Sequence, residues 1–165
     1  MGHAFYITVE GAKQGTLKGA TSGSPRQVEG AKTKNGKIAG IKFLAEATTA
    51  RDVATGQASG KRQHKAITIT KEWDASSPQL YQALVTNEVL KSVLFEFVKT
   101  DAKGEEYIHH TIKLTNAAVA NIKAYLDLTD TSGDPYDGHE LEDIAFSFQK
   151  IEMANVDGKT QAVDG

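Results

Sequence analysis

Five histidines and 21 acidic residues are the side chains of this 165-residue sequence that could hold a metal ion or transfer protons. His109 and His110 are adjacent within an alternating run, so on a strand their side chains point to opposite faces and cannot chelate one ion together. His139 precedes Glu140, but the second histidine of the helical zinc motif is missing. The absence of cysteine excludes disulfides, thiol catalysis and cysteine-ligated zinc. The sequence therefore predicts no metal site and no cofactor.

Motifs for nucleophilic catalysis and phosphate binding are incomplete. The sequence has neither the G-x-S-x-G of a nucleophile elbow nor a G-x-G-x-x-G loop. Gly56 and Gly60 are separated by three residues where a phosphate loop needs four, and Arg62 stands where Ser or Thr would bind magnesium. We expect no catalytic residue. Because carboxylates are numerous, one alternative stays open: a monomeric small β-barrel, acting as a binding module or a glycosidase-like hydrolase through the acidic segment 127–143.

The charge of the chain is nearly balanced in total but unevenly distributed. A formal net charge of −2 argues against nucleic acid as the main partner. Residues 1–72 carry 12 basic and 5 acidic side chains, whereas residues 73–165 carry 7 basic and 16 acidic ones. Uneven halves are typical of solvated faces or of complementary surfaces in a self-associating subunit. No apolar run reaches the roughly 20 residues that span a membrane, and Met1–Glu10 does not have the pattern of a secretory signal.

Strands are the elements that would position these side chains. Alternation of apolar and polar residues, which indicates a strand with one buried face, recurs along the chain between short turns. We expect about seven or eight strands, the clearest being Phe5–Val9, Ile38–Ala47, Ala66–Lys71, Val93–Phe97, Glu106–Leu114, Ile122–Leu128 and Ile144–Phe148. The predicted fold is mainly β: a compact two-sheet β-barrel with one flanking α-helix, forming a single domain over residues 1–165.

The helix is predicted between two of these strands. Ser77 is a suitable N-cap and is followed by proline at the first helical position. Behind it, the apolar pairs Leu80/Leu84 and Tyr81/Val85 are each spaced four apart, which predicts one apolar side on a short helix.

Three segments do not contribute to the predicted core. Thr48–Arg62 has almost no large apolar residue, and loops of this length are usually functional or flexible. In the last strand, Ile144, Phe146 and Phe148 point inward, which leaves a small and polar face opposite them. That face consists of Asp143, Ala145, Ser147 and Gln149. Residues 153–165 are expected to form a flexible tail.

Three long stretches stand in a fixed order along the chain: AFYITVEGAKQG (4–15), SGKRQHKAITITKEWDASSPQLYQAL (59–84) and HELEDIAFSFQKIE (139–152). Together they resemble the haemolysin-coregulated protein (Hcp) family of type VI secretion systems. The middle stretch is the most specific, and the resemblance covers roughly residues 4–153. Trp73-Asp74 departs from the small or aliphatic residues expected there, and Gly19–Lys34 matches poorly, so nothing is carried across that region.

The resemblance implies a structural subunit and not an enzyme. It implies a homohexamer, in which six copies close into a ring and rings stack into the inner tube of a contractile injection apparatus. The implied partners are further copies of the chain, the spike and sheath proteins of the apparatus, and small effector proteins carried or chaperoned in the ring lumen. It also implies a bacterial cytoplasmic origin followed by secretion through the apparatus without a signal peptide, and neither nucleic-acid binding nor membrane insertion.

The same resemblance suggests roles for two of the three segments that lie outside the predicted core. The polar loop 48–62 would reach onto a neighbouring copy, and its candidate interface residues are Arg51, Asp52, Gln57, Lys61 and Arg62. The small polar face of the last strand would line the lumen, with Asp143, Ser147 and Gln149 as candidates. A closed ring would also remove exposed sheet edges.

Overall fold

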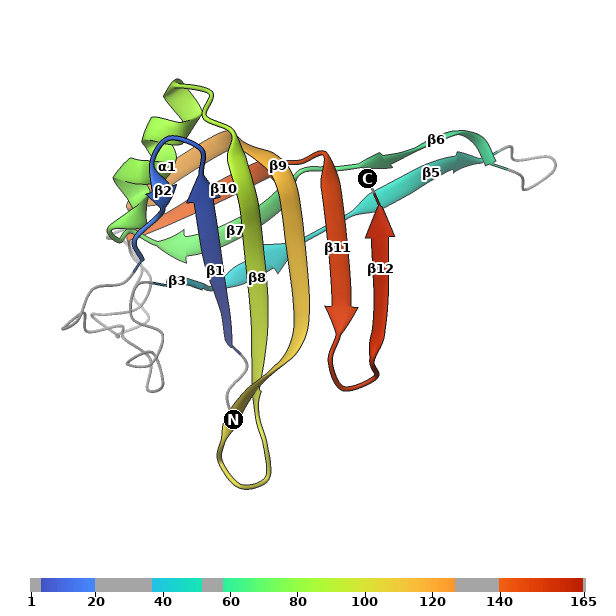
Figure 1. Ribbon diagram of the computed structural model, residues 1–165. Coiled ribbons are helices and arrows are strands. Elements are labelled where there is room, and N and C mark those ends of the chain that lie inside the picture. The colour runs from blue at the N-terminus through green and yellow to red at the C-terminus, as the bar shows by residue number, and fades with distance from the viewer. Residues whose placement is uncertain (1–3, 20–36, 52–57, 127–139, 165) are drawn as a thin grey trace.

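The computed structural model describes residues 4–19, 37–51, 58–126 and 140–164, which contain one helix and twelve strands. In chain order they are β1 (Ala4–Gly11), β2 (Gly15–Thr16), β3 (Ile38–Gly40), β4 (Lys42–Leu44), β5 (Ala47–Arg51), β6 (Ala58–His64), β7 (Ile67–Glu72), α1 (Ser76–Val85), β8 (Leu90–Thr100), β9 (Glu106–Leu126), β10 (Glu140–Ser147), β11 (Lys150–Asn155) and β12 (Thr160–Asp164). The expected mainly β fold with one flanking helix is confirmed (Figure 1).

The strands form two layers that close on each other. The main sheet has the order β2-β1-β8-β9-β10-β7-β4, with β3 added to β1 and the β11–β12 pair added to β9. In Figure 1, β1, β8, β9, β11 and β12 lie in front of β7 and β10. Because β3 pairs with β1 and the following β4 pairs with β7, the segment 38–44 joins the two ends of the sheet. The amide of Ile41 completes this closure by donating to the carbonyl of Thr70 at 2.8 Å.

The longest strand, β9, belongs to both layers. Its first part pairs with β8 and β11, and its second part pairs with β10. The alternation of the sequence predicts two separate strands here, and the structure corrects this to one strand of 21 residues. Asn116, with φ of 51°, lies where the partners change, and asparagine is one of the few residues that tolerate this left-handed conformation.

The core lies between the two layers and follows the predicted alternation. Ile7 and Val9 of β1 are buried, as are Ile144 and Phe146 of β10, and each such side chain contributes roughly 1.5–3 kcal/mol through burial. Aromatic rings fill one end of the core. The ring centroid of Phe43 lies 5.0 Å from that of Phe95 and 5.1 Å from that of Phe97, and the ring planes are steeply inclined to each other. Edge-to-face contacts of this kind add stabilisation beyond burial.

The predicted strand Ile38–Ala47 is interrupted where the chain changes layers. Ile41 is 55% exposed, so it is out of phase with the half-buried Phe43. Gly40 is required at the change because a Cβ atom there would lie 2.1 Å from the ring of Phe5. The alternation of apolar and polar residues does not predict that the Phe5 ring packs against the backbone at Gly40.

The helix begins two residues earlier than predicted, with Ala75 at the N-cap position and Ser76 as its first residue, and it is capped differently. Ser77 is inside α1, and the carboxylate of Asp74 accepts from the amide of Ser76 at 2.8 Å. Leu80 is buried as expected, whereas Tyr81 and Val85 are more than half exposed. The buried side of α1 is therefore narrower than the predicted apolar stripe.

The segment predicted as a flexible tail is ordered into a hairpin. Strands β11 and β12 pair from Asn155 opposite Thr160 to Ile151 opposite Asp164. In the turn between them, the amide of Gly158 donates to the Asn155 side chain at 2.8 Å. The prediction was wrong because β11 also pairs with β9, which supplies a template that the polar tail sequence does not reveal.

Candidate assembly surface

The most prominent feature outside the barrel is the β5–β6 hairpin, which projects away from the body (Figure 1). Ala47 lies opposite His64 at its root, followed by Thr48 opposite Gln63. Within the described part of the chain, β5 and β6 pair with each other and with no other strand. The predicted loop 48–62 is thus, in its described part, a two-stranded ribbon, because its threonines and small residues are compatible with extended pairing.

The candidate interface residues lie along this ribbon. Arg51 is the last residue of β5, and Lys61 and Arg62 lie in β6, with Arg62 opposite Thr49. Asp52 and Gln57 lie outside the described residues. The structure therefore gathers three of the five candidates on one projecting element, and their role in an interface stays a prediction.

The three candidate lumen residues do not all lie on the outward face of one strand, although the alternation predicts that they do. Asp143 lies on the outward face of β10, where its Oδ1 accepts from the Thr70 hydroxyl at 2.7 Å. Burial and then the nearby Asp143 carboxylate raise the pKa of Tyr125. Ser147 is the exposed last residue of β10. Gln149 follows in the turn to β11 and accepts from the Asn116 amide at 3.3 Å, so it lies beyond the strand.

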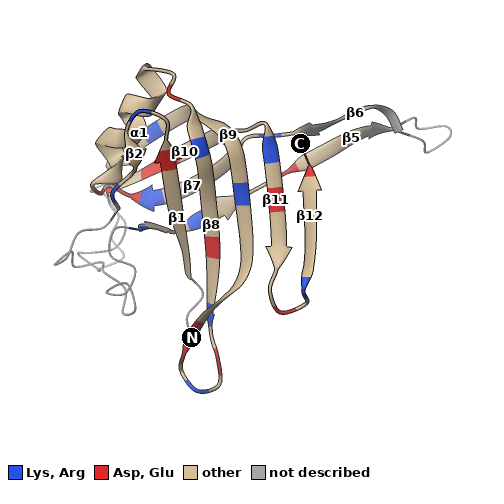
Figure 2. Ribbon diagram, viewed as in Figure 1, with Lys and Arg blue, Asp and Glu red and all other residues tan. Residues whose placement is uncertain are grey.

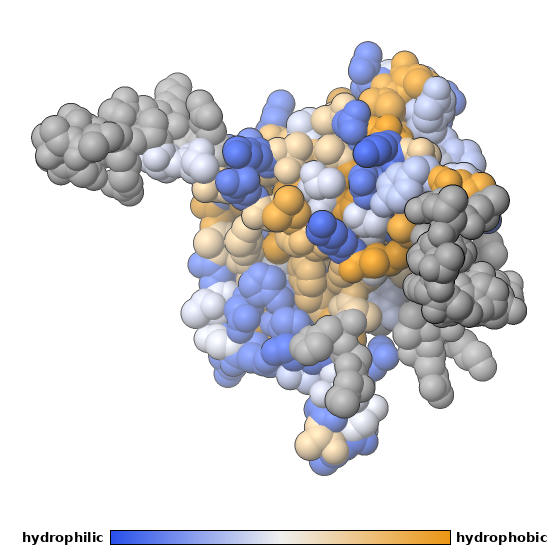
Figure 3. All heavy atoms as spheres, turned by 180° about the vertical axis from the view of Figure 1, so that it is seen from behind, coloured by the Kyte–Doolittle hydropathy of each residue, from blue (hydrophilic) through white to orange (hydrophobic). Residues whose placement is uncertain are grey.

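The outward face of the second layer continues this polar character. Register places Thr70 beside Asp143, and Asp143 beside Lys123. Thr68 lies beside Ala145 in the same way. Viewed from behind Figure 1, apolar and hydrophilic side chains are interspersed over the described surface (Figure 3).

A buried ion network fixes the start of α1 to this layer. The side chain of Lys71 is 0% exposed, and its Nζ lies 2.6 Å from Glu142 Oε1 and 2.9 Å from Asp74 Oδ1. The Ser77 hydroxyl also donates to Glu142, at 2.7 Å. A charge this deep is tolerated only when it is paired and hydrogen-bonded. The network therefore ties β7, β10 and α1 into one unit.

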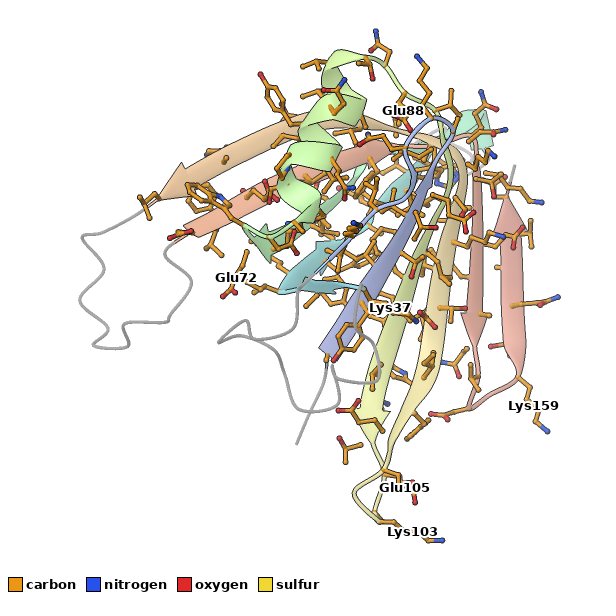
Figure 4. The ribbon with its side chains drawn as sticks, turned by 60° about the vertical axis from the view of Figure 1, so that its left-hand side comes forward. Lys37, Glu72, Glu88, Lys103, Glu105 and Lys159 are labelled. Carbon is orange, nitrogen blue, oxygen red and sulfur yellow. The ribbon has the colours of Figure 1, made fainter. Side chains whose placement is uncertain are left out.

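A second carboxylate organises the other end of α1. Glu88 accepts from the amides of Lys13 and Gln14 at 2.9 and 2.8 Å, which locks the β1–β2 turn against the helix (Figure 4). Burial alone would raise the pKa of Glu88, but these hydrogen bonds outweigh it and hold the pKa below its usual value. Gly11 permits the contact, because a Cβ atom there would lie 2.2 Å from Glu88 Oε2.

Sequence reasoning did not identify these ionic residues, although a weak signal existed. Lys71 is in phase with the buried Ile67 and Ile69, and Glu142 is in phase with the buried Ile144. A lysine and a glutamate at inward positions of two strands indicate a buried pair once the strands are known to be neighbours. The neighbour relation, which comes from the fold, was the missing information.

The histidines and carboxylates do not converge on a reactive centre in the described residues. His110 is half-buried, with its Nδ1 3.3 Å from the Asn155 amide nitrogen and its ring 5.9 Å from that of Phe97. No group of three or more potential ligands is found in the described ranges. The carboxylates of Asp74 and Glu142 are close together, but both are engaged by Lys71. No described helix has the length and apolar character needed to cross a membrane.

Comparisons with known proteins agree with this architecture. The family model described as "Type VI secretion system effector, Hcp" matches residues 6–154. The "Major exported protein" of Pseudomonas aeruginosa is 31% identical over 150 residues, which cover 88% of this chain and 85% of that protein.

Solved structures give the same result. A crystal structure of an Hcp protein superposes with a TM-score of 0.88 at 26% identity, covering 99% of this chain and 97% of that one. The Hcp1 protein of an E. coli pathovar superposes with a TM-score of 0.78, also at 26% identity, covering 98% and 97%. The family match over most of the sequence and the similarity of the whole fold together show that this chain belongs to the Hcp family of type VI secretion system proteins.

Proposed function

We propose that this chain is a structural subunit of the type VI secretion inner tube, in which six copies close into a ring and rings stack. The observation that carries the proposal is the projecting β5–β6 hairpin. In the described part of the chain its two strands pair with each other alone, and an isolated two-stranded ribbon is at best marginally stable in water. A neighbouring copy would supply the missing surface, with Arg51, Lys61 and Arg62 as its polar contacts.

Open sheet edges support the same proposal. In the described part of the chain, β4 pairs with β7 alone and β12 pairs with β11 alone. Unpaired edges are templates for further association, and a closed ring satisfies them without forming an endless polymer. Val163 of β12 and Leu44 of β4 are both more than half exposed, which adds apolar area at these edges.

The polar face of the second layer would line the ring lumen. Thr68, Thr70, Asp143, Ala145 and Ser147 are small or polar, which suits a hydrated channel that carries effector proteins. The chain would be made in the bacterial cytoplasm and secreted by the apparatus. Its further partners would be the spike and sheath proteins of that apparatus. Enzymatic activity is not part of the proposed function, and the neighbouring carboxylates of Asp74 and Glu142 are both paired with Lys71.

The decisive measurement is the mass of the purified protein by light scattering. We expect about six times the 17.7 kDa of one copy, and hollow rings by negative-stain microscopy. A monodisperse monomer at micromolar concentration would contradict the proposal and leave the monomeric binding module or hydrolase as the better reading.

The hairpin is tested by replacing residues 48–62 with a Gly-Ser turn. Because Ala47 lies opposite His64, a short turn can close the chain at the root without disturbing the barrel. We expect an unchanged circular dichroism spectrum and a reduced mass. A second variant that replaces only residues 52–57 with Gly and Ser separates the strands of the hairpin from its tip. Full ring mass in the first variant would show that the hairpin has another role.

A further inference from the structure

The root of the projecting hairpin touches the C-terminal strand through a histidine and a carboxylate. His64 is the last residue of β6, and its Nε2 lies 2.5 Å from Oδ2 of Asp164 in β12. The two residues are 100 positions apart in the sequence, and their side chains are 29% and 28% exposed. Since β12 belongs to the body and β6 to the hairpin, this contact links the two parts directly.

The surroundings of the contact are mostly apolar. Asp164 lies opposite the buried Ile151, so its side chain is on the inward face of the β11–β12 ladder. The His64 ring packs against Phe148, with ring centroids 5.4 Å apart. Beside them is a cavity of about 100 Å³, whose other walls include Ala45, Ala47, Ile67 and Met153. An attraction between charges is stronger in such a setting than in open water.

Among the described side chains, Asp164 is the charged group that contacts His64. Glu46 and Lys65 also line the cavity, but they pair with each other at 3.4 Å and are more than half exposed. The other elements packed around the ring contribute Ile67, Phe148 and Met153, which carry no charge. Among the described groups, a positive charge on His64 would therefore interact chiefly with the carboxylate of Asp164.

We propose that the contact between His64 and Asp164 seats the hairpin on the body, and that protonation of His64 tightens this seat. Imidazole is the side chain that gains a proton between pH 5 and 8. Imidazolium and carboxylate form a charge-assisted hydrogen bond, which is about twice as strong as a neutral one. The seat is thus firm where the imidazole carries the proton and weaker where it does not. The contact lies within one copy; only its consequence, tighter subunit association in mild acid, rests on the proposed function.

The test is hydrogen exchange of the full chain at about pH 5.5 and pH 8, corrected for the intrinsic pH dependence of amide exchange. We expect the amides of residues 160–164 and the root of β6 to lose protection about two- to fivefold at the higher pH, the size of a partly exposed ion pair. His64→Gln and Asp164→Asn should show the lower protection at both pH values. His64→Lys, which keeps a positive charge, should stay protected at both.

Lys65→Gln is the matched control, because it removes the neighbouring exposed ion pair and leaves the seat intact. It should keep the pH dependence of the parent. The same pH dependence in His64→Gln, or none in the parent, would overturn the proposal, as would a loss of protection in His64→Lys at low pH. The mass of the protein, measured in parallel, distinguishes this proposal from the proposed function. Protection that does not change with pH in a protein of ring mass would overturn the His64–Asp164 seat alone. Protection that changes with pH in a monomer would overturn the ring alone.

Discussion

The barrel body and the projecting hairpin are both antiparallel, but different forces hold them. In the body, inward residues such as Ile144 and Phe146 are fully buried, so each strand is stabilised by its layer and by the layer opposite. In the hairpin, β5 and β6 have their mutual backbone pairing and a sequence of threonine, small and charged residues. The body is therefore stabilised by its own two layers. Among the described residues the hairpin has no second layer, so its conformation depends on the contacts at its root and on any neighbouring copy.

Two lysines show the same difference on a smaller scale. Lys71 is fully buried between Glu142 and Asp74, and Lys65, at the foot of the hairpin, is 61% exposed beside Glu46. Each forms an ion pair, yet solvent screens the second pair and not the first. An ion pair of lysine with a carboxylate is thus essential for the stability of the body, whereas the same kind of pair at the hairpin contributes little to stability.

The largest expected effect comes from removing the buried charge. Lys71→Met should destabilise the protein by about 3–5 kcal/mol, because Glu142 and Asp74 would remain buried without their cation. Lys65→Met, as the matched change at the hairpin, should cost less than about 1 kcal/mol. The urea midpoint, read together with the slope of the transition, measures both. Equal losses would show that burial does not distinguish the two lysines.

A steric change at the closure of the barrel should rank second. Gly40→Ala places a methyl group 2.1 Å from the ring of Phe5, which must then move out of its site. Overpacking of this kind costs roughly 1–3 kcal/mol. Gly104→Ala is a useful comparison, because it meets no atom within 4 Å and tests only the positive φ of 82°. Gly40 does not have a positive φ, so unchanged stability in Gly40→Ala would show that the Phe5 ring can move aside without cost.

Glu88→Gln should cost about 1–3 kcal/mol near neutral pH, since the amides of Lys13 and Gln14 lose a charged acceptor. The pKa of Glu88 is lowered on folding, so its contribution is fully present above the unfolded pKa of about 4.3 and is lost as the pH falls through the folded value. Unfolding curves between pH 7 and pH 3 should therefore converge for the variant and the parent. A constant difference over that range would contradict the lowered pKa.

The smallest effect is expected on the exposed side of α1. Tyr81 is 59% exposed, so Tyr81→Ser should change the stability of the isolated copy by less than about 0.5 kcal/mol. Leu80→Ala, one position away and buried, should cost about 2–5 kcal/mol. A large loss from Tyr81→Ser only in the assembled protein would place this side chain in a contact between copies.

Local alternation was sufficient to predict the barrel, the position of its helix and the inward faces of β1 and β10. It was insufficient wherever a partner strand decided the outcome. The polar tail became β12 because β11 offered an edge, and Thr48–Arg62 became a ribbon in its described part because its two halves pair. Those associations depend on strand order, which no periodicity encodes.

Charge was predicted least well, for a related reason. Among the described residues, the basic side chains of the first half and the acidic side chains of the second half do not separate in space, since blue and red segments are interspersed over the ribbon (Figure 2). Figure 4 shows Lys103 and Glu105 in the turn between β8 and β9, and Lys159 apart from them in the turn between β11 and β12. The two halves of the sequence do meet in the sheet, because β1 from the first half pairs along its length with β8 from the second, with Ala4 opposite Val98.

Three of the candidate interface residues, Arg51, Lys61 and Arg62, lie on one element, and their role in an interface stays a prediction. The residues that fix the root of that element were not predicted.

The unusual length of β9 has a consequence for how the chain reaches its native state. One strand must find β8, which precedes it closely, and also β10 and β11, which follow it in the sequence. The β8–β9 hairpin can form early, because the Asp101–Glu105 turn closes a short loop. The second layer forms only when β10 pairs with both β9 and β7. Because β7 and β10 are far apart in the sequence, this pairing is non-local and slow. Until then the open edges of β9 are exposed, so newly made copies are most vulnerable to wrong association before the barrel closes.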